Sequence, residues 1–168
     1  MAESLEELLA RYGPRLGRIA TGLLGDPVQA ADAVQDTFAD AWRALSRGER
    51  VSDPGAWLAT LCLNLCRTRL RTRRRERLAL EELARSAPAE TPRPRTGIEQ
   101  AEQHAAALAA LEALPETERE AVLLIAVDGM TSVQAAAVMG CSPAAARVHL
   151  GRGRRRLADR LTHPAPND

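Results

Sequence analysis

Arginine side chains gather in two clusters along this chain, and a guanidinium group is suited to binding phosphate. Residues 67–77 hold seven arginines against Glu76 alone, and residues 147–160 hold six more. Arginine stays ionised at neutral pH and binds phosphate through paired N–H donors, so two separated clusters favour contact with a polyanion at two places. All 23 basic residues are arginine, which a GC-rich genome also explains, so the clustering carries more weight than the absence of lysine.

The second cluster lies in residues 131–161, whose start and stop signals predict two short helices. Thr131 can cap the first helix, and Gln134, three residues later, completes a capping box. Gly140 tolerates the positive φ of a helix end, and Ser142 before a proline can cap the second helix. Helix, tight turn and helix form a helix-turn-helix, which brings the start of its second helix to base edges in DNA.

Helical spacing predicts which faces of these two helices are buried. On the first helix we expect a small apolar face made of Val133, Ala136, Ala137 and Met139. On the second helix we expect an apolar stripe made of Ala146, Leu150, Gly153, Leu157 and Leu161, with the arginines elsewhere. An ordinary α-hairpin with a solvated, arginine-rich face is the alternative, since it also has two helices joined by a turn with glycine.

Composition limits the remaining possibilities. A chain of 168 residues with 45% hydrophobic and 2% aromatic residues can build one large or two small domains from Leu, Ala and Val. No run of about 18 apolar residues is present to span a membrane. The acidic N-terminus MAESLEELLA lacks the features of a signal peptide, so we expect a cytoplasmic protein without a membrane partner.

The cysteines and histidines do not form a recognisable catalytic or metal-binding pattern. Cys62, Cys66 and Cys141 are odd in number and lack CxxC spacing, which argues against a disulfide framework. Cys62 and Cys66 lie one helical turn apart, so a metal site with His104 or a redox pair is conceivable, but buried small residues are favoured. We assign these residues no role, and we expect no enzymatic activity, no cofactor and no metal.

Periodicity predicts an all-α chain without strands. The expected helices cover residues 2–24, disturbed at Gly13-Pro14, then residues 28–45, then a helix from Pro54 into the arginine run. Residues 84–97 contain three prolines and few apolar residues, so they predict an extended, flexible linker. Helical spacing resumes at Ile98, breaks at Leu114-Pro115 and continues to Asp128-Gly129.

Three stretches of this chain resemble extracytoplasmic-function (ECF) sigma factors of the sigma-70 family. DPVQAADAVQDTFADAW (26–42) and PGAWLATLCLNLCRTRLRTRRR (54–75) are similar to sigma region 2, and residues 111–161, with the Asp-Gly turn and the helix-turn-helix, are similar to sigma region 4. The resemblance implies two small helical domains, region 2 over 1–83 and region 4 over 98–162, joined by the linker and followed by a tail over 163–168.

The resemblance also implies partners for the first of these domains. An acidic and polar helix face, best matched by Asp32, Gln35, Asp36 and Trp42, would dock on the β′ clamp helices of the RNA polymerase core. The next helix would melt and recognise the minus-ten promoter element. Asn64 would contact a base there, while phosphates would be bound by Arg67, Arg69, Arg71, Arg73 and Arg74. The loop 46–54 would hold a flipped base, although it contains no aromatic residue for stacking.

For the second domain, the resemblance implies contact with the minus-thirty-five element and with the β flap of the polymerase. Arg147, His149 and Arg152 lie where the family contacts this element. Arg147 is near the helix start, as base contact requires, whereas Arg152, Arg154 and Arg155 are better placed for phosphate. The chain departs from the family pattern at Val148 and Gly151. The implied function is promoter-specific transcription initiation, and a further implied partner is an anti-sigma factor.

Two other kinds of protein would fit parts of this pattern. A stand-alone helix-turn-helix transcriptional regulator would not need the acidic helix face or the helix with Asn64 for promoter activity. An adaptor that binds polymerase without promoter DNA would not need arginines on the helix that follows Ser142.

Overall fold

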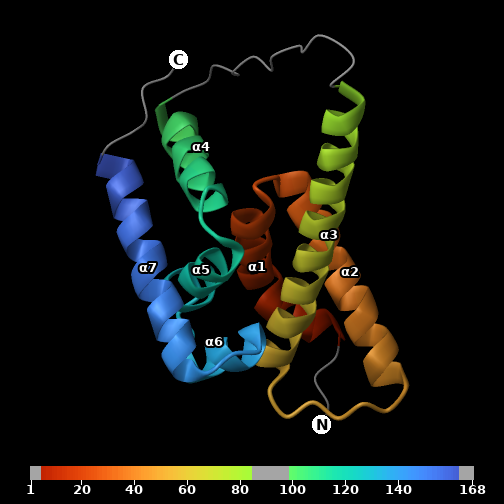
Figure 1. Cartoon of the computed structure of the whole chain (residues 1–168). Coiled ribbons are helices and arrows are strands. Elements are labelled where there is room, and N and C mark those ends of the chain that lie inside the picture. The colour runs from red at the N-terminus through yellow and green to blue at the C-terminus, as the bar shows by residue number, and fades with distance from the viewer. Residues whose placement is uncertain (1–4, 85–98, 163–168) are drawn as a thin grey trace.

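A computed structural model describes residues 5–84 and 99–162, and every regular element in these two ranges is a helix (Figure 1). The all-α prediction is confirmed for them. The predicted linker, apart from Ala84 at a helix end, and the tail over 163–168 lie outside the described residues.

Three helices form the N-terminal half: α1 (Leu5–Leu24), α2 (Pro27–Ser46) and α3 (Pro54–Ala84). Local capping explains where α2 and α3 begin. The Asp26 carboxylate accepts hydrogen bonds from the backbone N–H groups of Val28 and Gln29, and Asp53 accepts one from Ala56 at 3.0 Å. The first two helices therefore meet at a tight turn, in which Gly25 has φ +69°.

The expected disturbance of the first helix at Gly13-Pro14 is wrong. α1 continues from Leu5 to Leu24 with Pro14 inside it. Proline removes one backbone hydrogen bond, but Pro14 is exposed while Leu16 and Ile19 are each 1% exposed in the core. Burial of the apolar face on either side of the proline keeps the helix continuous.

The C-terminal half contains α4 (Glu99–Glu112), α5 (Glu116–Ala121), a π-helical turn η1 (Val122–Val127), α6 (Ser132–Met139) and α7 (Pro143–Thr162). The breaks predicted at Leu114-Pro115 and at Asp128-Gly129 are confirmed, since α4 ends before the first and η1 before the second. The π-helical turn was not predicted. It lets the backbone N–H of Asp128 donate to the carbonyl oxygen of Leu123 at 2.9 Å.

The helix-turn-helix forms with the predicted caps. Thr131 and Gln134 make the full capping box at the start of α6, and Gly140 ends that helix with φ +73°. The Ser142 hydroxyl then accepts a hydrogen bond from the backbone N–H of Ala145 at 3.1 Å, at the start of α7.

The buried face of α6 differs from the predicted one. Val133 is 64% exposed and Ala137 is also exposed, whereas Ala135 and Val138 are buried beside Ala136. An eight-residue helix made mostly of small apolar residues has no strong preference of its own for one face. The helices that flank α6, α3 and α7, therefore decide which of its sides is buried.

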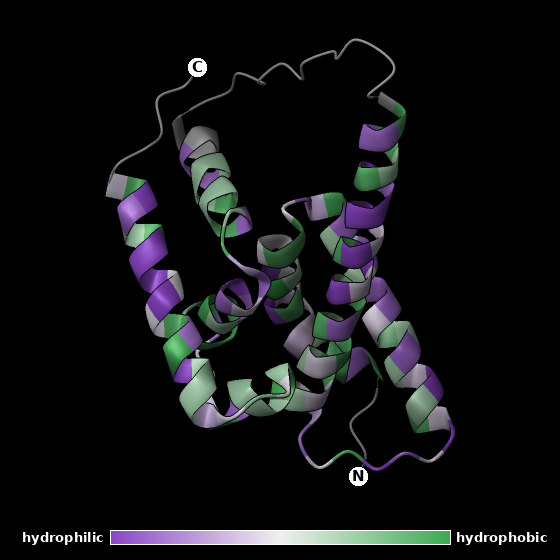
Figure 2. Cartoon of the chain, in the orientation of Figure 1, coloured by the Kyte–Doolittle hydropathy of each residue, from purple (hydrophilic) through white to green (hydrophobic). Residues whose placement is uncertain are grey.

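One continuous core joins the two halves (Figure 2). Helix α6 packs against α3, and α1 packs against α4, α5 and η1. The approach is closest at Gly22, where an added Cβ atom would lie 2.4 Å from a methyl carbon of Leu123. The structure therefore shows the two halves closed against each other.

We expect alanine at the two glycines of α7 to have opposite effects. No atom lies within 4 Å of a Cβ at Gly151, so Gly151→Ala should raise the free energy of unfolding by up to about 1 kcal/mol through helix propensity. A Cβ at Gly153 would meet Val122 at 2.8 Å and the Glu118 carbonyl oxygen at 3.0 Å, so Gly153→Ala should lower it by about 1–3 kcal/mol. Urea denaturation of both variants measures this; equal effects would contradict the packing of α7 on α5.

Candidate nucleic-acid interface

The residues predicted to contact the minus-ten element lie along α3, but they differ in accessibility. Asn64, Arg71 and Arg74 are exposed. Arg67, Arg69 and Arg73 are half-buried, and each makes a contact with another part of the chain. The arginine run is therefore only partly open to a ligand in this arrangement.

Arg67 is bound by Glu120 of α5. Its Nε donates to Oε1 of Glu120 at 2.6 Å, and its Nη2 donates to Oε2 at 2.7 Å. The Glu120 side chain is 1% exposed and that of Arg67 is 20% exposed, so water hardly screens this pair. The hydrogen bonds to Glu120 raise the pKa of Arg67 above its ordinary value, against the opposing effect of burial.

Arg69 and Arg73 fasten α3 to the rest of the N-terminal half. Arg69 pairs with Asp36 of α2 at 2.5 Å and donates to the Gln29 carbonyl oxygen at 3.1 Å. Arg73 donates to the Leu24 carbonyl oxygen at the end of α1, at 2.9 Å. Both arginines therefore hold the helices of this half together, whatever else they bind.

The predicted polymerase-docking residues lie on the exposed side of α2. Asp32, Gln35, Asp36 and Trp42 are all exposed, and the Trp42 side chain is 57% exposed. The opposite side of α2 is buried through Ala33, Phe38 and Ala41, among others. Tryptophan is enriched among the residues that contribute most to protein–protein binding, so an exposed Trp42 is compatible with an interface on this side of α2.

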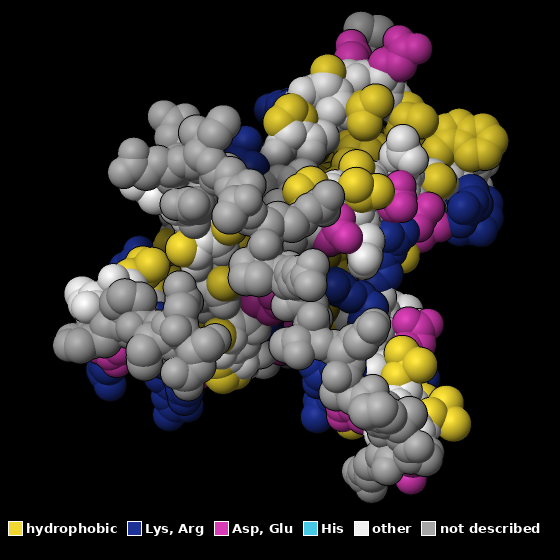
Figure 3. Space-filling model, turned by 90° about the horizontal axis from the view of Figure 1, so that it is seen from above, with side chains coloured by type: hydrophobic (Ala, Val, Ile, Leu, Met, Phe, Trp, Pro, Cys, Tyr) yellow, Lys and Arg dark blue, Asp and Glu magenta, His cyan; other side chains and the backbone are white. Residues whose placement is uncertain are grey.

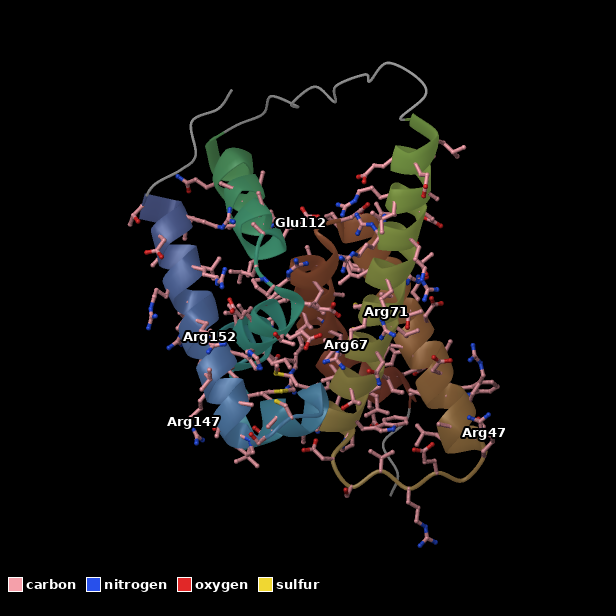
Figure 4. All side chains as sticks on the ribbon, viewed as in Figure 1. Arg47, Arg67, Arg71, Glu112, Arg147 and Arg152 are labelled. Atoms are coloured by element: carbon pink, nitrogen blue, oxygen red, sulfur yellow. The ribbon has the colours of Figure 1, made fainter. Side chains whose placement is uncertain are left out.

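The predicted upstream-element residues lie on α7. Arg147, Arg152, Arg154 and Arg155 are exposed, and His149 is half-buried. Arg147 stands in the first turns of α7 and donates to the Ser132 hydroxyl at 3.4 Å. Figure 4 shows Arg147 and Arg152 on α7 at one side of the molecule, and Arg67 and Arg71 on α3 across from them.

The loop before α3 forms part of a pocket of about 290 Å³. Besides loop residues such as Arg50 and Ser52, Trp57 of α3 lines this pocket, and Ala137 and Val138 of α6 line it from the other half. The loop 46–54 itself contains no aromatic residue. The structure brings one to it from the first turn of α3, a position that the loop sequence alone did not reveal.

A second, larger cleft of about 560 Å³ lies between α3 and the α4–α5 segment. Arg71, Arg74 and Arg77 of α3 line one side, and Glu112 and Glu116 line the other. Figure 3, seen from above, shows arginine and acidic side chains next to one another on this face. The cleft is therefore of mixed charge.

The cysteines behave as core residues. Cys62 and Cys66 are free thiols with 0% exposure, as expected for small residues on an apolar face. The hydrogen bond with Cys62 and burial both raise the pKa of Cys66, so its thiol stays protonated. Within residues 5–84 and 99–162, no group of three His, Cys, Asp or Glu side chains could hold a metal ion, and no helix is long and apolar enough to cross a membrane.

Both halves of the chain match family models. The Sigma-70 region 2 model matches residues 8–76, and the Sigma-70 region 4 model matches residues 104–157. The first match contains α2 and the arginines of α3 up to Arg75, and the second contains the helix-turn-helix up to Leu157.

Similar proteins cover nearly the whole chain. The ECF sigma factor EcfG of Rhodopseudomonas palustris is 31% identical over 94% of this chain and 85% of its own length. The ECF sigma factor SigE of Mycolicibacterium smegmatis is 32% identical over 94% of this chain, which spans 62% of SigE. The sigma factor RpoE of Bartonella quintana, solved with the anti-sigma factor NepR, has a TM-score of 0.73 and 28% identity, covering 95% of this chain and 98% of that one. The chain therefore belongs to the ECF sigma factors of RNA polymerase, within the sigma-70 family.

Proposed function

We propose that this sigma factor uses three separate surfaces to direct initiation: α2 binds the polymerase core, α3 recognises and melts the minus-ten element, and α7 recognises the minus-thirty-five element. The observation that carries this proposal is the distribution of exposed side chains. The carboxylates and Trp42 gather on the outer side of α2, whereas exposed arginines gather on α3 and α7.

The exposed side chains of α7 suit the recognition of duplex DNA. Arg147 lies near the start of α7, the part of a recognition helix that reaches base edges in the major groove. The exposed Arg152, Arg154 and Arg155 lie further along, where positive groups reach phosphate. The β flap would be the polymerase contact of this half, and the β′ clamp helices the contact of α2.

The chemistry of α3 fits a binder of opened DNA. Asn64 is exposed and can both donate to and accept from a base, and Arg71 and Arg74 stand exposed further along the same helix. The pocket beside loop 46–54 offers an indole face at Trp57 for an unstacked base. We place the protein in the cytoplasm, where the polymerase and the promoter are.

An anti-sigma factor is a further proposed partner. RpoE of Bartonella quintana, with a similar fold over nearly its whole chain, was solved in complex with one. The cleft between α3 and the α4–α5 segment, which is lined by arginines and glutamates, offers polar contacts to such a partner.

Run-off transcription on a library of genomic fragments tests the function. Core polymerase with the chain should start at sites that share two spaced upstream elements, and core polymerase alone should not. The Asp32→Ala variant separates the sigma factor from a stand-alone regulator, because a regulator does not need the outer side of α2, where Asp32 is exposed. Initiation that does not depend on the chain would refute the proposal.

We expect two arginines of α7 to have different effects on promoter choice. Arg147→Ala should relax preference at one position of the upstream element by about 1–3 kcal/mol, because it removes a bidentate base contact. Arg154→Ala should weaken binding to all sequences and lower the salt dependence by about one phosphate contact. Binding to promoter variants at several salt concentrations measures both. Similar behaviour of the two variants would contradict this division between base and phosphate contacts.

A further inference from the structure

The closed arrangement of the two halves is too small for both promoter contacts at once. Elements centred near positions minus ten and minus thirty-five are about 25 base pairs apart, or roughly 85 Å at about 3.4 Å per base pair. A compact chain of 168 residues has a radius of gyration of about 15 Å, so it is about 40 Å across. If the proposed function holds, on which this inference rests, the halves separate when the chain binds a promoter.

Polar contacts between described residues span what we term the inter-half interface, and one residue that makes them is predicted to bind DNA. Arg15 of α1 pairs with Asp128 at 2.6 Å, and Arg119 of α5 donates to the Leu23 carbonyl oxygen at 2.8 Å. Arg67 of α3 makes a bidentate pair with Glu120 and also donates to the Met139 carbonyl oxygen. Of these three arginines, only Arg67 is predicted to bind promoter phosphate.

The carboxylate of Glu120 occupies Arg67 as a phosphate would. Arginine binds carboxylate and phosphate in the same way, through two parallel N–H···O bonds from one edge of the guanidinium. Both donors on that edge are used, and Arg67 Nη2 also donates to the Met139 carbonyl oxygen at 3.3 Å. The Nε and Nη2 donors of Arg67 are therefore engaged by the C-terminal half.

We propose that Glu120 is an internal competitor for promoter DNA: it holds Arg67 in the closed chain, so α3 binds single-stranded DNA fully only after the halves separate. This competition affects the proposed DNA-binding surface on α3 and leaves the one on α7 unaffected. Ala137 and Val138 of α6 also line the pocket beside Trp57, whereas Arg147 and Arg152 of α7 stay exposed. The free chain is thus restrained at the minus-ten surface alone.

Binding of the full chain to a fluorescent single-stranded oligonucleotide of mixed sequence tests this proposal. Apparent affinity is the intrinsic affinity multiplied by the open fraction of the chain. Glu120→Gln removes the charge that holds Arg67 and should therefore raise the open fraction of the chain. If that fraction rises by about tenfold, the dissociation constant for the oligonucleotide should fall by about tenfold. The radius of gyration in solution should increase in the same variant.

Glu118→Gln is the matched control. Glu118 lies on the same helix and is 5% exposed, but its partner is Arg156 of α7, at 3.0 Å and within the C-terminal half. The substitution removes the same charge without touching the inter-half interface, so the affinity for the oligonucleotide should stay within about twofold of wild type. Equal gains in both variants, or no gain in a folded Glu120→Gln chain, would overturn the proposal.

Arg15→Gln is a second variant for the same binding measurement, to be used if Glu120→Gln does not fold. It weakens the inter-half interface at Asp128, leaves Arg67 and Glu120 intact, and should also raise affinity for the oligonucleotide. Unchanged affinity in a folded Arg15→Gln chain would then overturn the proposal. If the chain initiates in the run-off assay but the folded variants show unchanged affinity for single-stranded DNA, only the internal competition is refuted. If the chain never initiates, the proposed function is refuted.

Discussion

Arg119→Met should lower the free energy of unfolding by about 3–5 kcal/mol, the largest stability effect that we expect from a single arginine in this chain. The Arg119 guanidinium is 8% exposed and donates to three carbonyl oxygens, those of Leu23 at 2.8 Å, Glu112 at 2.5 Å and Leu114 at 3.1 Å. Two of these lie at the ends of α1 and α4, where helices leave carbonyl groups without a partner. Methionine fills similar space but leaves these acceptors unsatisfied.

Part of this loss is offset, because burial lowers the pKa of Arg119 and its charge is therefore costly to bury. At about 2–4 °C per kcal/mol, the melting temperature should fall by about 10 °C. Circular dichroism during heating measures it, with Arg160→Met as the control. Arg160 is exposed on the same half, so its loss should change stability by less than about 0.5 kcal/mol. Equal shifts in the two variants would show that Arg119 does not join the helix ends.

Trp42→Ala should weaken binding to the polymerase core by at least about 2 kcal/mol, or roughly thirtyfold, and should leave the chain folded. Trp42 is 57% exposed, so less than half of its surface is buried in the free chain and lost with the side chain. If the outer side of α2 docks on polymerase, this side chain is the largest apolar group available there to become buried.

Val28→Ala is the control for this prediction. Val28 lies on α2, is 70% exposed and precedes the predicted docking residues. Its loss should change core affinity by less than about 0.5 kcal/mol, as for most interface-rim positions. Titration of fluorescent chain with core polymerase gives both affinities. If Trp42→Ala binds as tightly as Val28→Ala, docking does not use this tryptophan.

Helix positions were largely predictable because their signals are local. The capping box of Thr131 and Gln134, the turn at Gly140 and the Asp-Pro start of α3 each depend on residues a few positions apart, and each formed as predicted. Regular spacing of apolar residues also placed α2 within one residue at each end. The family assignment followed from the same stretches.

The contacts between the halves were not predictable in this way. Glu118, Arg119 and Glu120 are consecutive charged residues, and all three are buried. Helical periodicity predicts that three successive positions are not all buried, and the charge of these residues predicts that all three are exposed. Their burial depends on partners far away in the sequence, such as Arg67 at a separation of 53 residues.

The same limitation applies to the candidate site. Sequence alone identified Arg67 as a phosphate-binding residue, and that prediction remains to be tested. What it could not supply was the carboxylate that faces Arg67, or the approach of Trp57 to the loop before α3. The burial of the charged residues 118–120, which shows that they need partners, becomes visible only in the structure.

The stability of the closed arrangement, in which Leu123 packs closely on Gly22, should depend on temperature. Leu123 is 2% exposed, and separating the halves returns apolar surface of this kind to water. Exposure of apolar surface raises the heat capacity, and the free energy that favours its burial declines on cooling. Closure therefore carries a negative heat-capacity change. Chilling should release a growing fraction of molecules from the closed state before any helix melts.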